Sequence, residues 1–211
     1  TTGKYANDKN NVKLLAYSPN DNTISTPSFI TPFYHGAELI TLIYQSNNGD
    51  VWYSINYGNG LVMQKAGSNE CVQYRRKDNP SPFNFGYLNK AAEDKSGNVY
   101  FSMNKDNKIL VWKNKQQQFE TWKMDSLLGR ADVHFGPLQH HIIDSKQNLW
   151  LAYEAVGLVK YNLETKKGKL YEQEDGLPYN IIDNMAADEQ DNIWIPTPKG
   201  LCCLLSSTNK F

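Results

Sequence analysis

The sequence lacks an excess of charge of either sign, a long apolar run, and enough cysteines for a disulfide framework. Its 211 residues carry 22 lysines and arginines against 22 aspartates and glutamates. A neutral chain has no general attraction to nucleic acid or to an anionic membrane, so we expect no nucleic-acid partner. No stretch of about 18 apolar residues occurs, and none is therefore expected to span a bilayer. Residues 1–5 lack an apolar signal core, which predicts a mature or cut N-terminus.

The three cysteines, Cys71, Cys202 and Cys203, are an odd count for disulfide pairing. Cys202 and Cys203 are adjacent, so on a strand they point to opposite faces and cannot share one conventional partner. We interpret all three as small, buried apolar residues. They do not indicate a compartment.

What the sequence does contain is one short phrase that recurs four times. Each copy is a polar turn, an aliphatic residue and a large aromatic ring, at 48–52, 96–100, 146–150 and 190–194. The rings are Trp52, Tyr100, Trp150 and Trp194. A repeat of about 45–50 residues with four short strands per unit is typical of a propeller blade. We therefore predict an all-β fold of propeller blades, each built from four antiparallel strands.

The strand pattern predicts that residues 1–211 form one propeller fragment. A partial blade is expected at 12–26, and full units at about 39–75, 88–122, 138–171 and 182–211. Lys210 and Phe211 resemble Lys169 and Leu170, where the outer strand of the third unit opens, so the chain is expected to end where a last outer strand begins. No helix of about ten or more residues shows a 3.6-residue period.

The rings and the glycines that follow them are expected to be structural. A bulky ring beyond each turn packs between blades, and we expect all four rings to be buried core residues. Glycine lets the neighbouring strand approach closely. The glycines at this position are Gly60, Gly157 and Gly200.

The last two units carry the detail of a known family. The run at 188–201 has an acidic residue, a turn, Asn, an aliphatic residue, Trp, Thr and then Gly-Leu, and it resembles the two-component-regulator propeller repeat. The linker at 175–180 is similar to that family's Gly-Leu-Pro-x-Asn segment between blades. The third unit matches at 144–150 and at Gly157-Leu158, whereas the first two units are degenerate. The resemblance covers residues 39–211.

This resemblance implies a function. Members of the family are similar to the periplasmic sensor regions of bacterial hybrid two-component systems, many of which sense glycan breakdown products. They usually have seven blades per propeller, followed by an immunoglobulin-like domain, a membrane helix and a kinase. The resemblance therefore implies a ligand-sensing, extracytoplasmic fragment of a dimeric inner-membrane receptor, with a histidine kinase outside this chain. The fragment itself is expected to be no enzyme and to need no cofactor.

The geometry of a blade predicts where a ligand would bind. Strand direction alternates, so the loops between second and third strands lie at the same end as the inter-blade linkers, and pockets favour such loop ends. Arginine and aromatic side chains suit an oligosaccharide or acidic sugar, through bidentate hydrogen bonds and stacking. The candidate ligand-binding residues are Tyr57, Lys105, Arg130, His134, Glu154 and Tyr179.

The sequence gives little support for a metal site or for catalysis. His140 and His141 are adjacent and point to opposite faces of a strand, so they cannot chelate one ion together; we expect a structural role or a place along the channel. Residues 94–98 lack the downstream glutamate of a calcium loop. No Gly-x-Ser-x-Gly, His-Glu-x-x-His or phosphate-loop motif occurs. Two alternatives stay open: a protein-interaction scaffold, and a carbohydrate-active lyase or hydrolase.

Overall fold

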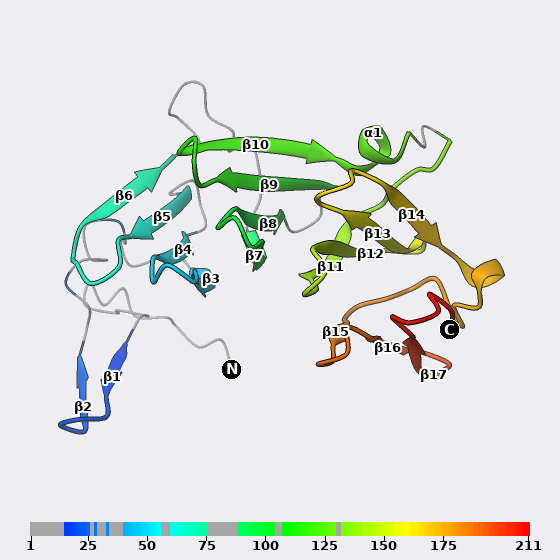
Figure 1. Cartoon of the computed structure of the whole chain (residues 1–211). Coiled ribbons are helices and arrows are strands. Elements are labelled where there is room, and N and C mark those ends of the chain that lie inside the picture. The colour runs from blue at the N-terminus through cyan, green and yellow to red at the C-terminus, as the bar shows by residue number, and fades with distance from the viewer. Residues whose placement is uncertain are drawn as a thin grey trace, which may run out of the picture. The chain divides into compact units, whose positions relative to one another are not determined.

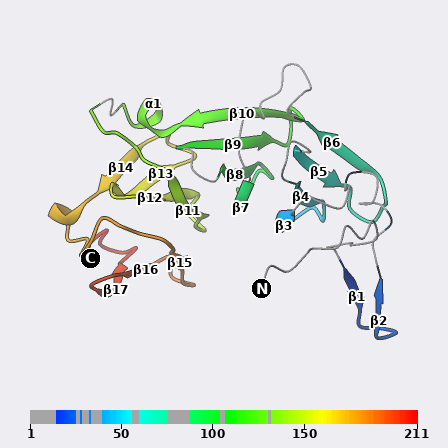
Figure 2. The ribbon, with the colours of Figure 1, turned by 180° about the vertical axis from the view of Figure 1, so that it is seen from behind.

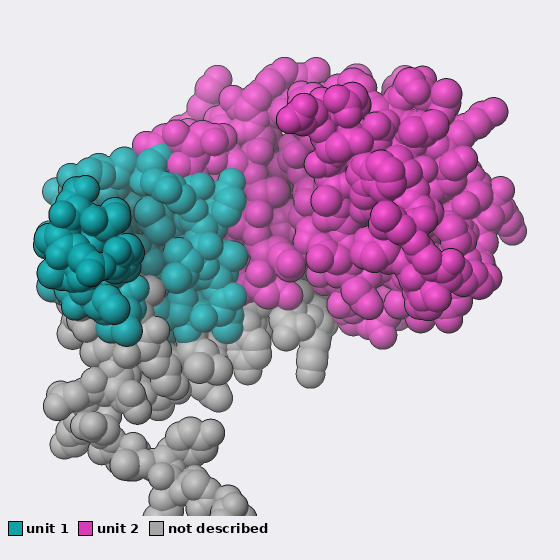
Figure 3. All heavy atoms as spheres, turned by 90° about the horizontal axis from the view of Figure 1, so that it is seen from below, with its two compact units in different colours: residues 1–45, 49–83 teal, residues 46–48, 84–211 magenta. Residues whose placement is uncertain are grey.

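The structure is a computed structural model that describes residues 15–25, 28, 33, 40–55, 60–75, 88–103, 107–129 and 132–211. The elements within these residues are β-strands, together with a five-residue helix, α1 (Met124–Leu128), and a 3-10 turn, η2 (Gln173–Asp175); Phe33 also has 3-10 geometry. The chain forms two compact units, residues 1–45 with 49–83 and residues 46–48 with 84–211, which are coloured separately in Figure 3. Among the described residues, no helix is long and apolar enough to cross a membrane.

The first unit contains a hairpin and one four-stranded sheet. The hairpin is β1 (Ala16–Ser18) paired with β2 (Thr23–Ser25). Sheet A is an antiparallel meander of β3 (Ile40–Gln45), β4 (Val51–Ile55), β5 (Gly60–Gln64) and β6 (Cys71–Tyr74). The strands form because aliphatic and aromatic residues alternate between turns rich in Gly and Asn. One face of sheet A buries Tyr53, Ile55 and Val62.

The second unit contains three more sheets, each again a meander in chain order (Figures 1 and 2). Sheet B consists of β7 (Leu88–Glu93), β8 (Val99–Met103), β9 (Lys108–Lys113) and β10 (Gln118–Lys123). Sheet C consists of β11 (Leu138–Ile143), β12 (Asn148–Tyr153), β13 (Gly157–Asn162) and β14 (Gly168–Tyr171). Sheet D consists of β15 (Ala186–Ala187), β16 (Ile193–Thr197) and β17 (Gly200–Leu204). The predicted all-β fold of four-stranded antiparallel blades is confirmed.

Sheet C lies between sheets B and D and is buried on both faces. One core cluster joins sheets B and C and includes Tyr100, Leu151 and Tyr153, with α1 packed against it. A second cluster joins sheets C and D and includes Trp150 and Ile195. Every residue of β12 is buried as a result. Face-to-face burial of alternating side chains is the interaction that holds neighbouring sheets together.

Three of the four repeated rings are core residues, and the fourth is not. Trp52, Tyr100 and Trp150 are at most 2% exposed, whereas Trp194 is 41% exposed. The expectation that Trp194 is buried was therefore wrong. Its ring projects from the face of sheet D that points away from sheet C, and no described sheet covers that face.

The glycines after the rings behave as predicted where a fourth strand is present. A Cβ on Gly157 would lie 2.4 Å from the Tyr171 carbonyl oxygen of β14, and one on Gly60 would lie 2.0 Å from the Tyr74 carbonyl oxygen of β6. Only glycine permits these approaches, and its positive φ at both positions adds a second reason. Gly200 also has a positive φ, but a Cβ there would meet nothing within 4 Å.

The end of the chain is placed differently from the expectation. The Leu205 N–H donates to the Lys210 carbonyl (2.9 Å) as the Asn162 N–H donates to the Lys167 carbonyl (2.8 Å). Lys210 and Phe211 therefore occupy the positions of Lys167 and Gly168, two residues before the predicted match to 169–170. The expected match was based on a lysine followed by an apolar residue at both places. The turn hydrogen bonds show which residues actually correspond. The assignment of residues 1–211 to one propeller fragment, with a partial blade at 12–26, stays a prediction.

Candidate functional site

Each sheet of the second unit has an aspartate in the turn that precedes its second strand. In sheet C, the Asp144 carboxylate accepts three hydrogen bonds of 2.8 Å, two from the backbone and side-chain amides of Asn148 and one from the Trp150 indole. The three residues are buried. The repeated ring is therefore held by the turn as well as by its apolar contacts. This explains why the sequence phrase couples an acidic residue, an asparagine and a ring.

The same arrangement recurs in sheet B with a tyrosine and in sheet D with a tryptophan. Asp94 accepts from the Tyr100 hydroxyl at 3.0 Å, and Asp188 accepts from the Trp194 indole at 2.9 Å. The hydrogen bond from the Trp194 indole, followed by those from Asn192, lowers the pKa of Asp188 to about 2. Burial, followed by the negative charge of Asp94, raises the pKa of the Tyr100 phenol, so this hydroxyl stays a donor at neutral pH.

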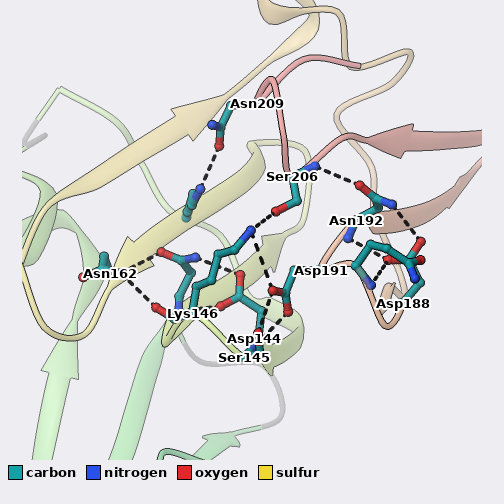
Figure 4. A network of polar contacts seen from close by, with 12 residues as sticks. Asp144, Ser145, Lys146, Asn162, Asp188, Asp191, Asn192, Ser206 and Asn209 are labelled. Carbon is teal, nitrogen blue, oxygen red and sulfur yellow. Dashed lines mark hydrogen bonds and ion pairs between the residues drawn. The ribbon is translucent and has the colours of Figure 1, made fainter.

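A second set of turn contacts crosses from one sheet to the next (Figure 4). Gln147 and Asp191 occupy the left-handed position of their turns, with φ of 62° and 59°. The Gln147 side-chain oxygen accepts from the Lys95 N–H of the sheet before it (2.8 Å), and Asp191 accepts from the Ser145 N–H (2.9 Å) and hydroxyl (2.6 Å). We call this contact the turn latch. The left-handed backbone turns the side chain out of its own turn and towards the preceding blade.

The latch between sheets C and D is the most connected. Lys146 lies 3.8 Å from the Asp191 carboxylate and donates to the Ser206 hydroxyl at 2.5 Å. The Ser206 N–H in turn donates to the Asn192 side-chain oxygen, and the Asn192 side-chain amide donates to the Asp188 carboxylate. Hydrogen bonds from Ser145 lower the pKa of Asp191, so it is a carboxylate at neutral pH. Figure 4 shows these side chains converging at one end of the two sheets.

Sheet B uses a different residue for the same purpose. Its left-handed turn position is Gly97, which has no side chain to offer. Glu93 accepts the equivalent bond instead, from the Asn47 N–H at 2.7 Å. Lys95 adds a cross-sheet ion pair with Glu164.

The loop end predicted to bind a ligand is described in part. Tyr57, Lys105 and Arg130 lie outside the described residues. His134, Glu154 and Tyr179 are described, and no hydrogen bond or ion pair joins these three to one another in the part of the chain that the structure describes. Their roles as ligand contacts stay predictions.

Glu154 lies in the turn between β12 and β13, where the blade geometry predicted it. Its N–H donates to the Pro137 carbonyl (3.1 Å), which places this turn beside the linker that enters β11. The Glu154 carboxylate accepts from the Gln139 side chain at 3.1 Å. The pairing of β11 with β12 shifts register between Leu138 and His140, so Gln139 is the bulged residue. A bulge re-aims a side chain, and here it directs an amide towards the loop end.

Tyr179 lies in the linker that leads into sheet D. The Lys199 ammonium, from the turn between β16 and β17, lies 5.8 Å from the centre of the Tyr179 ring. This distance is within the range of a cation–π contact. The next residue, Asn180, has a buried side-chain oxygen that accepts no hydrogen bond from the described residues. The linker and the loop of one sheet thus present an aromatic face and a cation.

His134 is exposed in the linker between sheets B and C. The following residue, Phe135, is buried and accepts a hydrogen bond at its carbonyl from the Asn107 side chain (3.3 Å). Asn107 belongs to the loop before β9, so linker and loop again lie together, as the sequence predicted. The structure brings the loop elements together without bringing the three described candidates into mutual contact.

The paired histidines have structural surroundings. His141 Nε2 lies 2.9 Å from the Tyr100 carbonyl oxygen of sheet B, so this ring donates across the boundary between sheets B and C. Burial lowers the pKa of His141 to about 4, and burial followed by the charge of Lys90 lowers the pKa of His140 to about 4. Both rings are neutral at pH 7. Among the described residues, no group of three His, Cys, Asp or Glu side chains could hold a metal ion.

Sequence reasoning missed Gln139, Lys199 and the latch residues. Lys199 could have been found, because it stands in the loop between the second and third strands of the fourth unit. Gln139 depends on a bulge, which leaves no signature in a single sequence. A non-glycine residue at the third position after the turn aspartate was a usable signal for Gln147 and Asp191, because such residues adopt a left-handed φ only at a cost.

Comparison with known proteins supports the fold. No family model matches the sequence, and no curated protein matches it. Solved structures do match: the extracellular domains of the hybrid two-component systems BT4673 and BT3049 of B. thetaiotaomicron, at 16% and 17% identity and TM-scores of 0.63 and 0.64. They cover 82% and 83% of this chain, which spans 24% and 23% of theirs. Virginiamycin B lyase of Staphylococcus aureus matches at 13% identity and a TM-score of 0.59, over 90% of this chain and 62% of the lyase.

These matches define the class of fold. The chain consists of β-propeller blades, of the kind found in the extracellular domains of hybrid two-component systems. The resemblance inferred from the repeat at 188–201 is thereby confirmed in its fold. At these identities the likeness concerns the fold alone, and the same fold occurs in a lyase. The chain spans about a quarter of the length of the sensor structures that it matches.

Proposed function

We propose that this chain is part of the extracytoplasmic, ligand-sensing propeller of a bacterial hybrid two-component sensor. The similarity to two extracellular sensor domains of such systems carries this proposal. The remaining blades and the downstream domains, including a histidine kinase and an inner-membrane anchor, belong to the rest of the same protein. The working receptor is a dimer, and this part of it is not catalytic.

The ligand is a glycan-derived oligosaccharide bound at the loop end. Tyr179 offers a ring face of the type that stacks on sugars, and Lys199 next to it offers a positive charge for a carboxylate or sulfate. The Glu154–Gln139 pair, in the loop of the preceding sheet, supplies hydrogen-bonding groups for hydroxyls. This combination favours an acidic sugar over a neutral one, because the cation beside the aromatic face attracts an anionic substituent of a sugar that stacks on the ring.

Signalling follows from a change in how the blades pack. The ligand end consists of linkers and loops that enter the inner strands, whereas the turn latches lie at the other end of the same strands. A ligand that binds one packing of the blades more tightly shifts the population towards it, and the latches are the contacts that differ between packings. The shift in blade packing is transmitted across the membrane to the kinase.

Calorimetric titration of the intact sensor tests the proposal. The probes are pectin-derived oligogalacturonides and heparin-derived fragments, compared with starch-derived oligosaccharides as neutral controls. We expect saturable binding of an acidic probe that Tyr179→Ala and Lys199→Ala abolish and Tyr179→Phe preserves. Lys115→Ala serves as the matched control, because Lys115 is an exposed lysine in an outer turn. A flat titration with every probe would contradict ligand sensing of this class.

The same experiment separates the alternatives. A lyase or hydrolase would shorten the oligosaccharide during incubation, which size analysis of the recovered probe detects. An interaction scaffold would bind no probe while retaining a protein partner. Virginiamycin B lyase shares the fold, so the recovered probe is analysed whether or not binding is seen.

A further inference from the structure

Two neighbouring inner strands carry three polar side chains that have no partner. Strands β7 and β11 are the first strands of sheets B and C, and they contact each other (Figures 1 and 2). Lys90 of β7 forms no hydrogen bond or ion pair within the part of the chain that the structure describes. The Nδ1 atoms of His140 and His141 in β11 are buried and also lack a hydrogen-bond partner there. Buried polar atoms nearly always have a partner in native proteins, so a cluster of three without one is unusual.

The strand register brings the three side chains to one place. Lys90 lies in the same cross-strand row as Ile109, and His141 lies opposite Leu151. Ile109 and Leu151 both belong to the core cluster between sheets B and C, so Lys90 and His141 project into the same interface from opposite sides. His140, the preceding residue on β11, projects from the other face of sheet C. The charge of Lys90 contributes, after burial, to the lowered pKa of both histidines, so its ammonium lies within electrostatic reach of both rings.

The cluster is set back behind the surface. His140 and His141 are 8% and 2% exposed, whereas Lys90 is half-buried. Strands β7 and β11 each have one edge that no other strand of the described residues pairs with, and in a propeller this edge of a blade lines the central channel. A molecule that contacts all three groups must therefore be small and must approach along these edges.

The donors and acceptors of the cluster follow from its contacts. His141 Nε2 lies 2.9 Å from the Tyr100 carbonyl oxygen, which can only accept, so Nε2 carries the hydrogen and Nδ1 of the neutral ring is an acceptor. The His140 ring makes no hydrogen bond to the described residues that would fix its tautomer, so it can present Nδ1–H as a donor. Lys90 adds a positive charge and three N–H donors. The cluster thus combines a cation, a neutral donor and a buried acceptor.

A carboxylate next to a hydroxyl matches all three groups. The carboxylate accepts from the Lys90 ammonium and from the His140 ring, and the hydroxyl donates to His141 Nδ1. A carboxylate alone would leave the His141 acceptor unpaired, and a hydroxyl alone would leave the Lys90 charge unpaired. We propose that Lys90, His140 and His141 bind a small hydroxycarboxylate, either a free sugar acid or a shorter hydroxy acid, at the inner edges of sheets B and C. This site goes beyond the oligosaccharide site of the loop end and includes neither Tyr179 nor Lys199.

The test is a nuclear magnetic resonance titration of the full chain at pH 7, isotopically labelled at its histidine ring nitrogens. Glycolate is the probe, and acetate and ethylene glycol are matched controls that lack its hydroxyl or its carboxylate. We expect glycolate to shift the ring signals of His140 and His141 saturably, at a concentration about tenfold or more below that at which either control acts. Galacturonate, titrated in parallel, distinguishes the two sources: tighter binding than glycolate identifies a sugar acid, and weaker binding identifies a shorter hydroxy acid.

Substitutions locate the site. Lys90→Met removes the charge and keeps the aliphatic stem, and it is expected to weaken glycolate binding by about tenfold or more. Lys115→Met is the matched control at an exposed lysine of an outer turn, and it is expected to leave binding unchanged. Tyr179→Ala, which removes the aromatic face of the loop end, is expected to leave the response of both histidine rings unchanged.

Three results would overturn the site. The first is the absence of a response of either ring to glycolate and to galacturonate. The second is an equal response to glycolate and to one of its two controls, because the combination of cation and acceptor would then select nothing. The third is a ring response that Lys90→Met leaves intact or that Tyr179→Ala abolishes, because the histidines would then report on binding elsewhere. The oligosaccharide titration of the loop end does not depend on these outcomes, so either site can fail alone.

Discussion

Replacing Asp144 by alanine should destabilise the second unit far more than the same change at Asp188. Both carboxylates accept hydrogen bonds from an asparagine and from a tryptophan indole. They differ in what surrounds the donors. Trp150 is 2% exposed, whereas Trp194 is 41% exposed. Water can therefore reach the indole that Asp188→Ala frees, but not the one that Asp144→Ala frees.

The size of the loss at Asp144 follows from the three donors. A buried donor left without an acceptor costs roughly 1–3 kcal/mol. Three such groups, the backbone and side-chain amides of Asn148 and the Trp150 indole, predict a loss of about 3–5 kcal/mol in the free energy of unfolding once partial relaxation is allowed. Asp144→Asn keeps the shape and half of the acceptors, so it should fall between alanine and the native residue.

Urea unfolding followed by far-ultraviolet circular dichroism measures the three variants side by side. Hydrogen exchange at the Asn148 amide shows whether the loss is local to sheet C. Equal losses at Asp144 and Asp188, or a loss below about 1 kcal/mol at Asp144, would refute the reasoning, because burial of the freed donors would then have no weight.

Three further predictions concern the glycines, the turns and the histidines. Gly157→Ala should cost about 2 kcal/mol or more in unfolding free energy, because its Cβ meets the Tyr171 carbonyl; Gly200→Ala, which shares the positive φ but meets nothing, should cost less in the same denaturation assay. Because the pKa of Asp188 is lowered in the folded state, its ionised carboxylate stabilises the fold at pH values above its ordinary pKa of 3.8, and this contribution disappears as the pH falls towards 2. The melting temperature of Asp188→Asn should therefore decline less over that pH interval than the melting temperature of the native chain. The pKa of His141 is about 4 in the folded state instead of 6.5, so between pH 6.5 and pH 4 the unfolded state binds a proton that the folded state does not. The folded state is therefore favoured above pH 6.5 and loses this advantage as the pH falls to 4. His141→Gln keeps a donor for the carbonyl across the sheet boundary, and its melting temperature should change less between those two pH values; an unchanged slope would count against this origin.

The strand pattern was readable from the sequence because each unit repeats the same local rules. Turns of Asp, Asn and Gly alternate with strands whose apolar residues have a period of two, and each rule points to the same fold. The close approach at Gly60 and Gly157 was predictable for the same reason. The exposure of Trp194 was not predictable, because burial depends on whether another sheet covers the face, and the phrase before Trp194 follows the same pattern of Asp, Asn, aliphatic residue and Trp as the phrase before Trp150.

The candidate site was predictable only to the level of its loops. The alternation of strand direction correctly placed the loop between the second and third strands beside an inter-blade linker, as the contacts of Glu154 with Pro137 and of Asn107 with Phe135 show. It could not tell which side chains meet, since the Gln139 bulge and the Tyr179–Lys199 contact depend on local backbone geometry. The latches were missed because an Asx turn accounts for the turn residues within a single blade. That explanation predicts no contact with a neighbouring blade.

The latch has a direction. In each latch between described residues the acceptor comes from the later blade and the donor from the earlier one, so the two sides of a blade are not interchangeable. A blade in the reverse orientation would place an N–H donor opposite another N–H donor. The latch therefore specifies which side of each blade meets the blade before it and which side meets the blade after it.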